Sequence, residues 1–137
     1  QNVIEYVTIA STGNATDFGD TTVARHGIAA TSDETRSVAA GGIQPWPSGG
    51  NYIEYVTTQT TGNATDFGDL TLGRDMGGNS AASDGTYAVF IMGGTSSNPY
   101  TSNVIDYVTI QTTGNATDFG DSAAQAEKGG AVAGAAS

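Results

Sequence analysis

The chain contains no cysteine, and only four of its 137 residues are basic. Neither a disulfide framework nor a thiolate metal site is therefore available. Fourteen acidic residues give a formal net charge of −10, whereas nucleic acids and anionic membranes require a basic face on their partners. No apolar run approaches the ~20 residues of a membrane span, and no signal-like segment opens the chain. We therefore expect no nucleic-acid partner and no membrane insertion.

The chain also lacks any sustained helical periodicity with caps, which predicts an all-β fold. Because the first residue is Gln1 and not Met, we expect a processed product or a piece of something longer. Short runs rich in β-branched and aromatic residues alternate with Gly, Asn and Asp turns. The expected strands are Val3–Ile9, Ala15–Gly19, Gly27–Thr31, Ser37–Ala40, Gly78–Ala82 and Tyr87–Met92.

A nine-residue sequence, TGNATDFGD, occurs three times without substitution, at residues 12–20, 61–69 and 113–121. Each copy follows a similar strand, which begins at Asn2, Asn51 or Asn103. The units therefore span about 50 residues, a length typical of propeller blades. We divide the single repeat domain, residues 1–137, into units 2–50, 51–102 and an incomplete 103–137.

The units resemble kelch-type β-propeller blades. The second expected strand ends in a Gly-Gly pair, the third carries a Tyr, the fourth carries a Phe, and an Arg follows it in two units. Phe stands where kelch blades usually carry Trp, so the repeat is kelch-like and divergent. The units are also similar to repeats in predicted tail-fibre or structural proteins of marine bacteriophages. The residues that carry the resemblance are Tyr6, Phe18, Arg25, Gly41, Gly42, Tyr55, Phe67, Arg74, Gly93, Gly94, Tyr107 and Phe119.

The resemblance implies blades of four antiparallel strands. The sequence then provides eleven strands, which make fewer than three blades, whereas closed propellers have about four to eight. Exposed sheet edges invite further pairing. We therefore expect either self-association or further blades of the same parent protein. The segment after Asp121 could supply one closing strand, or it could be a frayed end.

The repeated motif has several interpretations. Asn-Ala-Thr is a glycosylation sequon, Asp-Phe-Gly is a kinase triplet, and Asn14, Asp17 and Asp20 could offer oxygen ligands to calcium. The accompanying elements of a kinase site or an EF-hand loop are missing. A scaffold role, in which Asn and Asp close turns and Phe packs between blades, is favoured. We expect no metal and no cofactor.

Arg25 and Arg74 occupy matching positions in their units. We expect each to pair with a carboxylate on a neighbouring strand, the candidates being Glu5, Glu54 and Asp106, because an unpaired buried carboxylate is costly. A functional anion site is the alternative. His26, the one histidine, is expected at the surface.

The loops after the Gly-Gly pairs differ most between units. Loop 43–50 contains Gln44 and Trp46, and loop 95–102 contains Asn98 and Tyr100. Aromatic rings beside proline, among hydroxyls and amides, suit stacking on a sugar or gripping a protein. Alternatively, the rings cover a blade edge.

These patterns predict a non-enzymatic recognition or structural module at a virion or extracellular surface, such as a fibre or adhesion component. It would bind a glycan or a cell-surface protein through the two loops. The alternative is a carbohydrate-active propeller enzyme that uses paired carboxylates such as Asp33 and Glu34, or the acids of the Asp-Phe-Gly-Asp segment.

Overall fold

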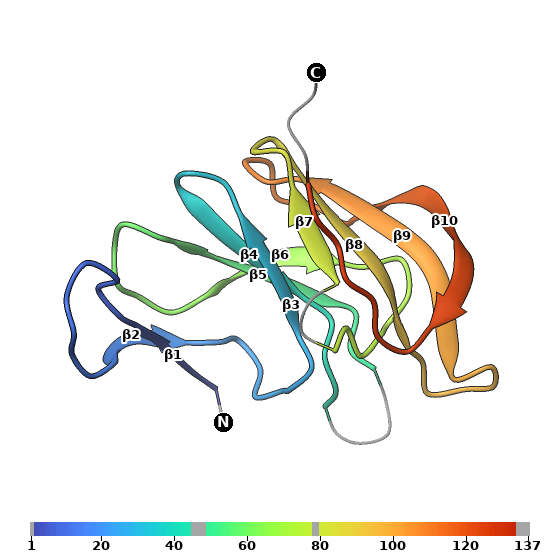
Figure 1. Cartoon of the computed structure of the whole chain (residues 1–137), viewed down its shortest axis with the longest axis horizontal. Helices are drawn as coiled ribbons and strands as arrows, with labels where there is room; N and C mark the ends of the chain where they lie inside the picture. The colour runs from blue at the N-terminus through green and yellow to red at the C-terminus, as the bar shows by residue number, and fades with distance from the viewer. Residues whose placement is uncertain (1, 45–48, 78–79, 134–137) are drawn as a thin grey trace.

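The computed structural model describes residues 2–44, 49–77 and 80–133, and these residues form ten antiparallel strands in three sheets (Figure 1). The described part of the chain contains no helix, and so none that is long and apolar enough to cross a membrane. The strands are β1 (Val3–Tyr6), β2 (Thr16–Asp20), β3 (Ala29–Ser32), β4 (Arg36–Ala40), β5 (Tyr52–Thr57), β6 (Thr65–Asp69), β7 (Ala81–Ser83), β8 (Tyr87–Gly94), β9 (Thr101–Thr109) and β10 (Thr117–Ala126).

Two of the sheets are four-stranded propeller-like blades, with strands in the order β3-β4-β5-β6 and β7-β8-β9-β10. The hairpin β1-β2 corresponds to the outer half of a third blade. The chain is thus all-β and carries fewer than three blades, as its sequence predicts. The expected eleventh strand is not seen, because no strand follows Ala126 within the part of the tail that is described, up to residue 133. The first strand is also shorter than expected, because it ends at Tyr6 and not at Ile9.

The two complete blades share one hydrophobic core. Their first strands, β3 and β7, contact each other near the middle of the molecule, and the blades spread outward from them (Figure 1). Small residues such as Ala29, Ala40 and Ala88 are fully buried in this core together with larger residues. The larger buried members of the core are Val38, Ile53, Phe67, Leu70, Met76, Phe90, Val108 and Ile110.

Each copy of the nine-residue motif contains a β-bulge at its phenylalanine. In the hairpin β5-β6, Ile53 pairs with Gly68 and Glu54 pairs with Asp66, so Phe67 is the extra residue. The same shift in register occurs around Phe18 and Phe119. The glycine that follows the phenylalanine has a φ between 134° and 151° in all three copies, a conformation that side chains disfavour.

The motif also joins consecutive blades. The N–H of Gly62 donates to the carbonyl oxygen of Phe18 (2.7 Å), and that of Ala64 donates to Asp20 (2.8 Å). The side-chain oxygen of Asn63 accepts from the N–H of Asp20 (3.0 Å). The turn of one motif therefore binds the return strand of the preceding motif.

The two Gly-Gly pairs are offset by one residue in the structure. The β-bridges His26–Ile43 and Asp75–Gly94 make Ile43 and Gly94 equivalent. Gly42 therefore matches Gly93, and Gly41 (φ 70°) matches Met92 (φ 55°). Gly41 has no room for a side chain because Met76 of the next connection packs on it, whereas Met92 packs against Gly129. The methionine side chain therefore comes from the connection after the fourth strand in the first case (Met76) and from the end of the second strand in the other (Met92).

Candidate functional site

The described parts of the two unlike loops, residues 43–44 and 49–50 in one and 95–100 in the other, lie at the same end of neighbouring blades. Loop 43–50 connects β4 to β5, and the loop between β8 and β9 occupies the equivalent place in the next blade. The latter is braced internally, since the Thr95 hydroxyl donates to the carbonyl oxygens of Ser97 and Pro99 (2.9 Å each). The N–H of Thr95 also donates to the carbonyl oxygen of Tyr100 (3.2 Å). Tyr100 is thereby held at the base of a compact loop, directly before β9.

A pocket of about 230 Å³ lies between the two loops. Ile43 and Gly49 form one wall, and Thr95, Ser96 and Tyr100 form another. The remaining lining comes from Gly94 at the end of β8 and from the connections after the fourth strands, which supply Asp75, Glu127 and Lys128. Tyr100 is 62% exposed, so most of its ring is available to a ligand.

The residues proposed from the sequence are placed differently with respect to this pocket. Tyr100 lines it, whereas Gln44 and Asn98 are exposed nearby and are not among its lining residues. Trp46 lies outside the described residues. The structure therefore brings one of the four proposed residues to a pocket together with the other loop.

Three charged lining residues, Asp75, Glu127 and Lys128, were not proposed from the sequence. Asp75 and Glu127 directly follow Arg74 and Ala126, where the first unit has the exposed His26. A position that carries His, Asp and Glu in three otherwise similar units is as variable as the two loops. That variability is the signal from which these residues could have been found.

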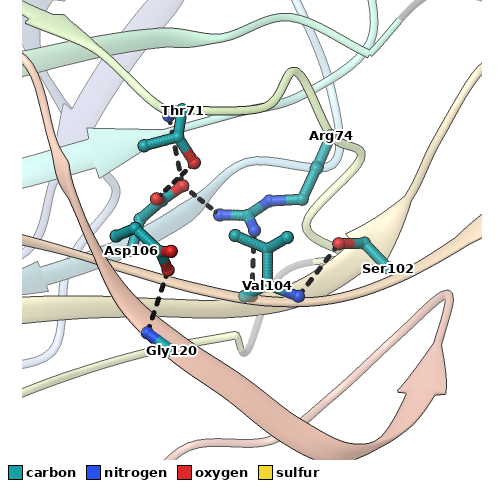
Figure 2. A network of polar contacts seen from close by, with 7 residues as sticks. Thr71, Arg74, Ser102, Val104, Asp106 and Gly120 are labelled. Atoms are coloured by element: carbon teal, nitrogen blue, oxygen red, sulfur yellow. Dashed lines mark hydrogen bonds and ion pairs between the residues drawn. The ribbon is translucent and has the colours of Figure 1, made fainter.

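A buried ion pair joins the two complete blades. The side chains of Arg74 and Asp106 are 0% exposed, and Nη2 of Arg74 donates to Oδ2 of Asp106 at 2.8 Å (Figure 2). Nη1 of Arg74 donates to the carbonyl oxygen of Val104 (2.9 Å), and the Thr71 hydroxyl donates to Oδ1 of Asp106 (2.6 Å). Burial lowers the pKa of the Arg74 guanidinium, and the Asp106 carboxylate acts against that shift. This guanidinium is thus occupied by a carboxylate within the chain.

The first blade junction repeats this arrangement. Nη2 of Arg25 lies 2.8 Å from Oε1 of Glu54, and both side chains are almost fully buried. The hydroxyl and N–H of Thr22 donate to Oε2 of the same carboxylate (2.6 and 2.8 Å). Two of the three carboxylates expected as partners are therefore paired with arginine, and the third, Glu5, is exposed.

Of the acids considered for catalysis, Asp33 and Glu34 lie in the turn between β3 and β4, whereas those of the Asp-Phe-Gly-Asp segments lie in strands β2, β6 and β10. Asp33 accepts hydrogen bonds from the backbone of Thr35 and Arg36 (2.7 Å each) and from the Gln111 side chain (2.6 Å). Partial burial acts to raise the pKa of Asp33. The hydrogen bonds from Gln111, Arg36 and Thr35 have a larger effect in the opposite direction, so the pKa is lowered to about 2. The general acid of a glycosidase needs a raised pKa, so the lowered pKa of Asp33 does not suit that role.

The other candidates for chemistry also stand apart. No group of three or more His, Asp or Glu side chains suited to a metal ion occurs among the residues that the structure describes. The motif residues Asn14 and Asp17 are exposed and Asp20 is half-buried. The equivalents of Asn14, which are Asn63 and Asn115, use their side-chain oxygens to accept from backbone N–H groups of the preceding blade.

Comparisons of the chain with models of known protein families and with curated protein sequences give no match.

Proposed function

We propose that the chain is a non-enzymatic, kelch-like recognition module that binds a glycan or a surface protein through the loop face around Tyr100. The observation that supports this proposal most strongly is that two loops, unlike in sequence, share one pocket beside an exposed tyrosine ring. Scaffold contacts are repeated from unit to unit, whereas this face differs in each. Loops that vary on a repeated framework are typical of a binding surface.

The chemistry of the pocket favours a glycan. A sugar offers an apolar ring face for stacking and several hydroxyls for hydrogen bonds. Tyr100 supplies the exposed ring, Ser96 supplies a hydroxyl, and Asp75 and Glu127 supply carboxylate acceptors. The Thr95 hydroxyl donates within its own loop, so only its oxygen can accept from a ligand. The volume of about 230 Å³ is smaller than that of most drug-sized sites, which suits one or two sugar rings held at the surface.

The setting that we propose is a virion fibre or an extracellular adhesion component. Support comes from the resemblance of the repeats to those of tail-fibre proteins, from the acidic composition and from the absence of cysteine.

The proposal is tested by measuring binding to a glycan array, followed by titration of the strongest glycan. We expect Tyr100→Ala to weaken binding at least about tenfold, equivalent to about 1.4 kcal/mol. Tyr87→Ala is the matched control, because Tyr87 belongs to the same blade and is 46% exposed but lines a different pocket. Equal binding by Tyr100→Ala and the wild-type chain would refute the assignment of this face. Binding to cells that survives removal of surface glycans would identify a protein ligand instead.

A further inference from the structure

We propose that two copies of this chain associate head to tail, with the turn Thr12–Ala15 of one copy bound to Phe119–Asp121 of the other. This inference concerns the ends of the blade array and is independent of the ligand proposed for the loop face. It rests on a contact that the chain already makes twice within itself, and on the two halves of that contact that are left open.

The contact at the second junction reproduces the first almost without change. The N–H of Gly114 donates to the carbonyl oxygen of Phe67 (2.8 Å), and that of Ala116 donates to Asp69 (2.8 Å). The side-chain oxygen of Asn115 accepts from the N–H of Asp69 (3.1 Å). Gly68 has no space for a side chain, because a Cβ there would collide with the Gly114 carbonyl oxygen.

Each half of this contact occurs once more with no partner among the described residues. Phe119–Asp121 has the same bulge and the same glycine conformation, but no turn of another blade bonds to it. A Cβ on Gly120 would meet no atom within 4 Å. At the other end of the array, no return strand bonds to the turn Thr12–Ala15, and its residues are exposed.

The open face of the last blade is apolar. Phe67, which the following blade covers, is 3% exposed, whereas the equivalent Phe119 is 66% exposed. Phe119 and Tyr107 line a pocket of about 480 Å³ together with Tyr87, Val89 and two residues of the chain's own tail, Val132 and Ala133. An exposed apolar surface of this kind marks an interaction site.

A second copy of the chain fits this surface best. The surface is complementary to a TGNA turn, and every copy of the chain carries one such turn unbound, in a sequence identical to the two bound ones. The interface joins different surfaces on the two copies, so it is heterologous and can close into a ring. Each copy contributes three outer hairpins, β1-β2, β5-β6 and β9-β10. Two copies would contribute six outer hairpins, which belong to four complete blades and two half blades, so that the ring falls within the range of about four to eight blades in closed propellers.

The open ends lack the buried arginine–carboxylate ion pair that is present at each internal junction. Ala123 and Ala126 stand where the preceding unit has Thr71 and Arg74, so Glu5 of a second copy would meet no guanidinium. Ala126 nevertheless pairs with Ser102 as Arg74 pairs with Gly50. The backbone is therefore in place for the contact. Association of two copies should be weaker than the internal contacts, and it should tighten when threonine and arginine are restored at positions 123 and 126.

Sedimentation equilibrium of the full chain over a range of concentrations tests the proposal. We expect a concentration-dependent dimer that Asn14→Ala weakens about three- to tenfold through the loss of one hydrogen bond. Phe119→Ser should weaken it at least about tenfold, as for a buried aromatic at an interface. The double variant Ala123→Thr/Ala126→Arg should tighten it at least about tenfold, and adding Glu5→Gln should remove most of that gain. A wild-type chain that stays monomeric up to about 1 mM, or one whose association ignores Asn14→Ala and Phe119→Ser, would overturn the proposal.

Cross-linking shows whether the association is head to tail. The chain has no cysteine, so Ala15→Cys and Asp121→Cys each introduce a single thiol. At the first internal junction the equivalent residues, Ala64 and Asp20, are joined by a backbone hydrogen bond of 2.8 Å. A short bismaleimide should therefore join the two variants when they are mixed, and should join neither variant to itself. Equal cross-linking within each single variant would contradict the head-to-tail arrangement.

Discussion

Arg74 and Asp106 bind each other across the junction of the two complete blades, at 2.8 Å and with neither side chain exposed. This ion pair joins the connection after β6 of one blade to β9, the third strand of the next blade. A charge buried in this way depends on its partner, because water cannot replace the partner when it is removed. The pair therefore makes the stability of each blade depend on its neighbour.

Removing one member of this pair should be costly. We expect Arg74→Met to lower the free energy of unfolding by about 3–5 kcal/mol, because it leaves the Asp106 carboxylate buried and unpaired. Urea unfolding followed by tryptophan fluorescence or circular dichroism measures the loss. Lys128→Met is the control; it changes an exposed residue and should alter stability by less than about 0.5 kcal/mol. The double variant Arg74→Met/Asp106→Leu should recover much of the loss, and failure to do so would mean that the ion is not the cause.

The repeated phenylalanines should differ in their contribution to stability despite their identical sequence context. Phe67→Ala should cost about 3–5 kcal/mol, because Phe67 is buried between two blades. Phe119→Ala should cost much less in the monomer, because that ring is two-thirds exposed. Thermal unfolding at low protein concentration makes the comparison. Equal losses would show that the ring stabilises its own hairpin and not the junction.

Glycines of the motif provide a second matched pair. Gly68→Ala and Gly120→Ala impose the same backbone strain, since both residues have a positive φ. Only Gly68→Ala also forces a Cβ against the carbonyl oxygen of Gly114. We expect Gly68→Ala to be more destabilising by about 1–3 kcal/mol, the usual cost of overpacking. The difference between their urea midpoints measures the junction contact alone.

Asp33 should make folding sensitive to acid. Its pKa is about 2 in the folded chain and about 3.9 when unfolded, so the unfolded state binds more protons between these values. Stability contributed by Asp33 is therefore complete above about pH 4 and is lost as the pH falls through about 2. Asp33→Asn should flatten the dependence of stability on pH within this window. Gln111→Leu should raise the Asp33 pKa toward its ordinary value, as measured by carboxyl NMR titration, and an unchanged pKa would contradict the role given to Gln111.

Much of the fold follows from the sequence because the repeat is nearly exact. The period gave the blade size, and the Tyr, Phe and Gly-Gly positions gave the order of strands within a blade. The matching positions of Arg25 and Arg74 also indicated a carboxylate partner. These features are local or periodic, so they can be recognised in a single amino-acid sequence.

Other features depend on contacts between units that the sequence does not display. The bulge at Phe67 and the offset between the Gly-Gly pairs depend on the register between paired strands. A shift of one residue in this register leaves the sequence pattern unchanged, so the pattern does not reveal it. The binding of Asn63 to Asp20 joins residues of different units, and the motif alone does not show that its turn faces the preceding blade. Asp75 and Lys128 reach the pocket beside Tyr100 only because the connections after two different blades converge there.

The way in which one TGNATDFGD segment fits the next has a consequence for how such a chain can grow or shrink. Each unit carries a turn that fits the unit before it and a return strand that fits the unit after it. A duplicated copy of the second unit would therefore meet both neighbours through contacts that already match. An array of this kind can change its length by whole units while the side chains at its loop face diversify independently.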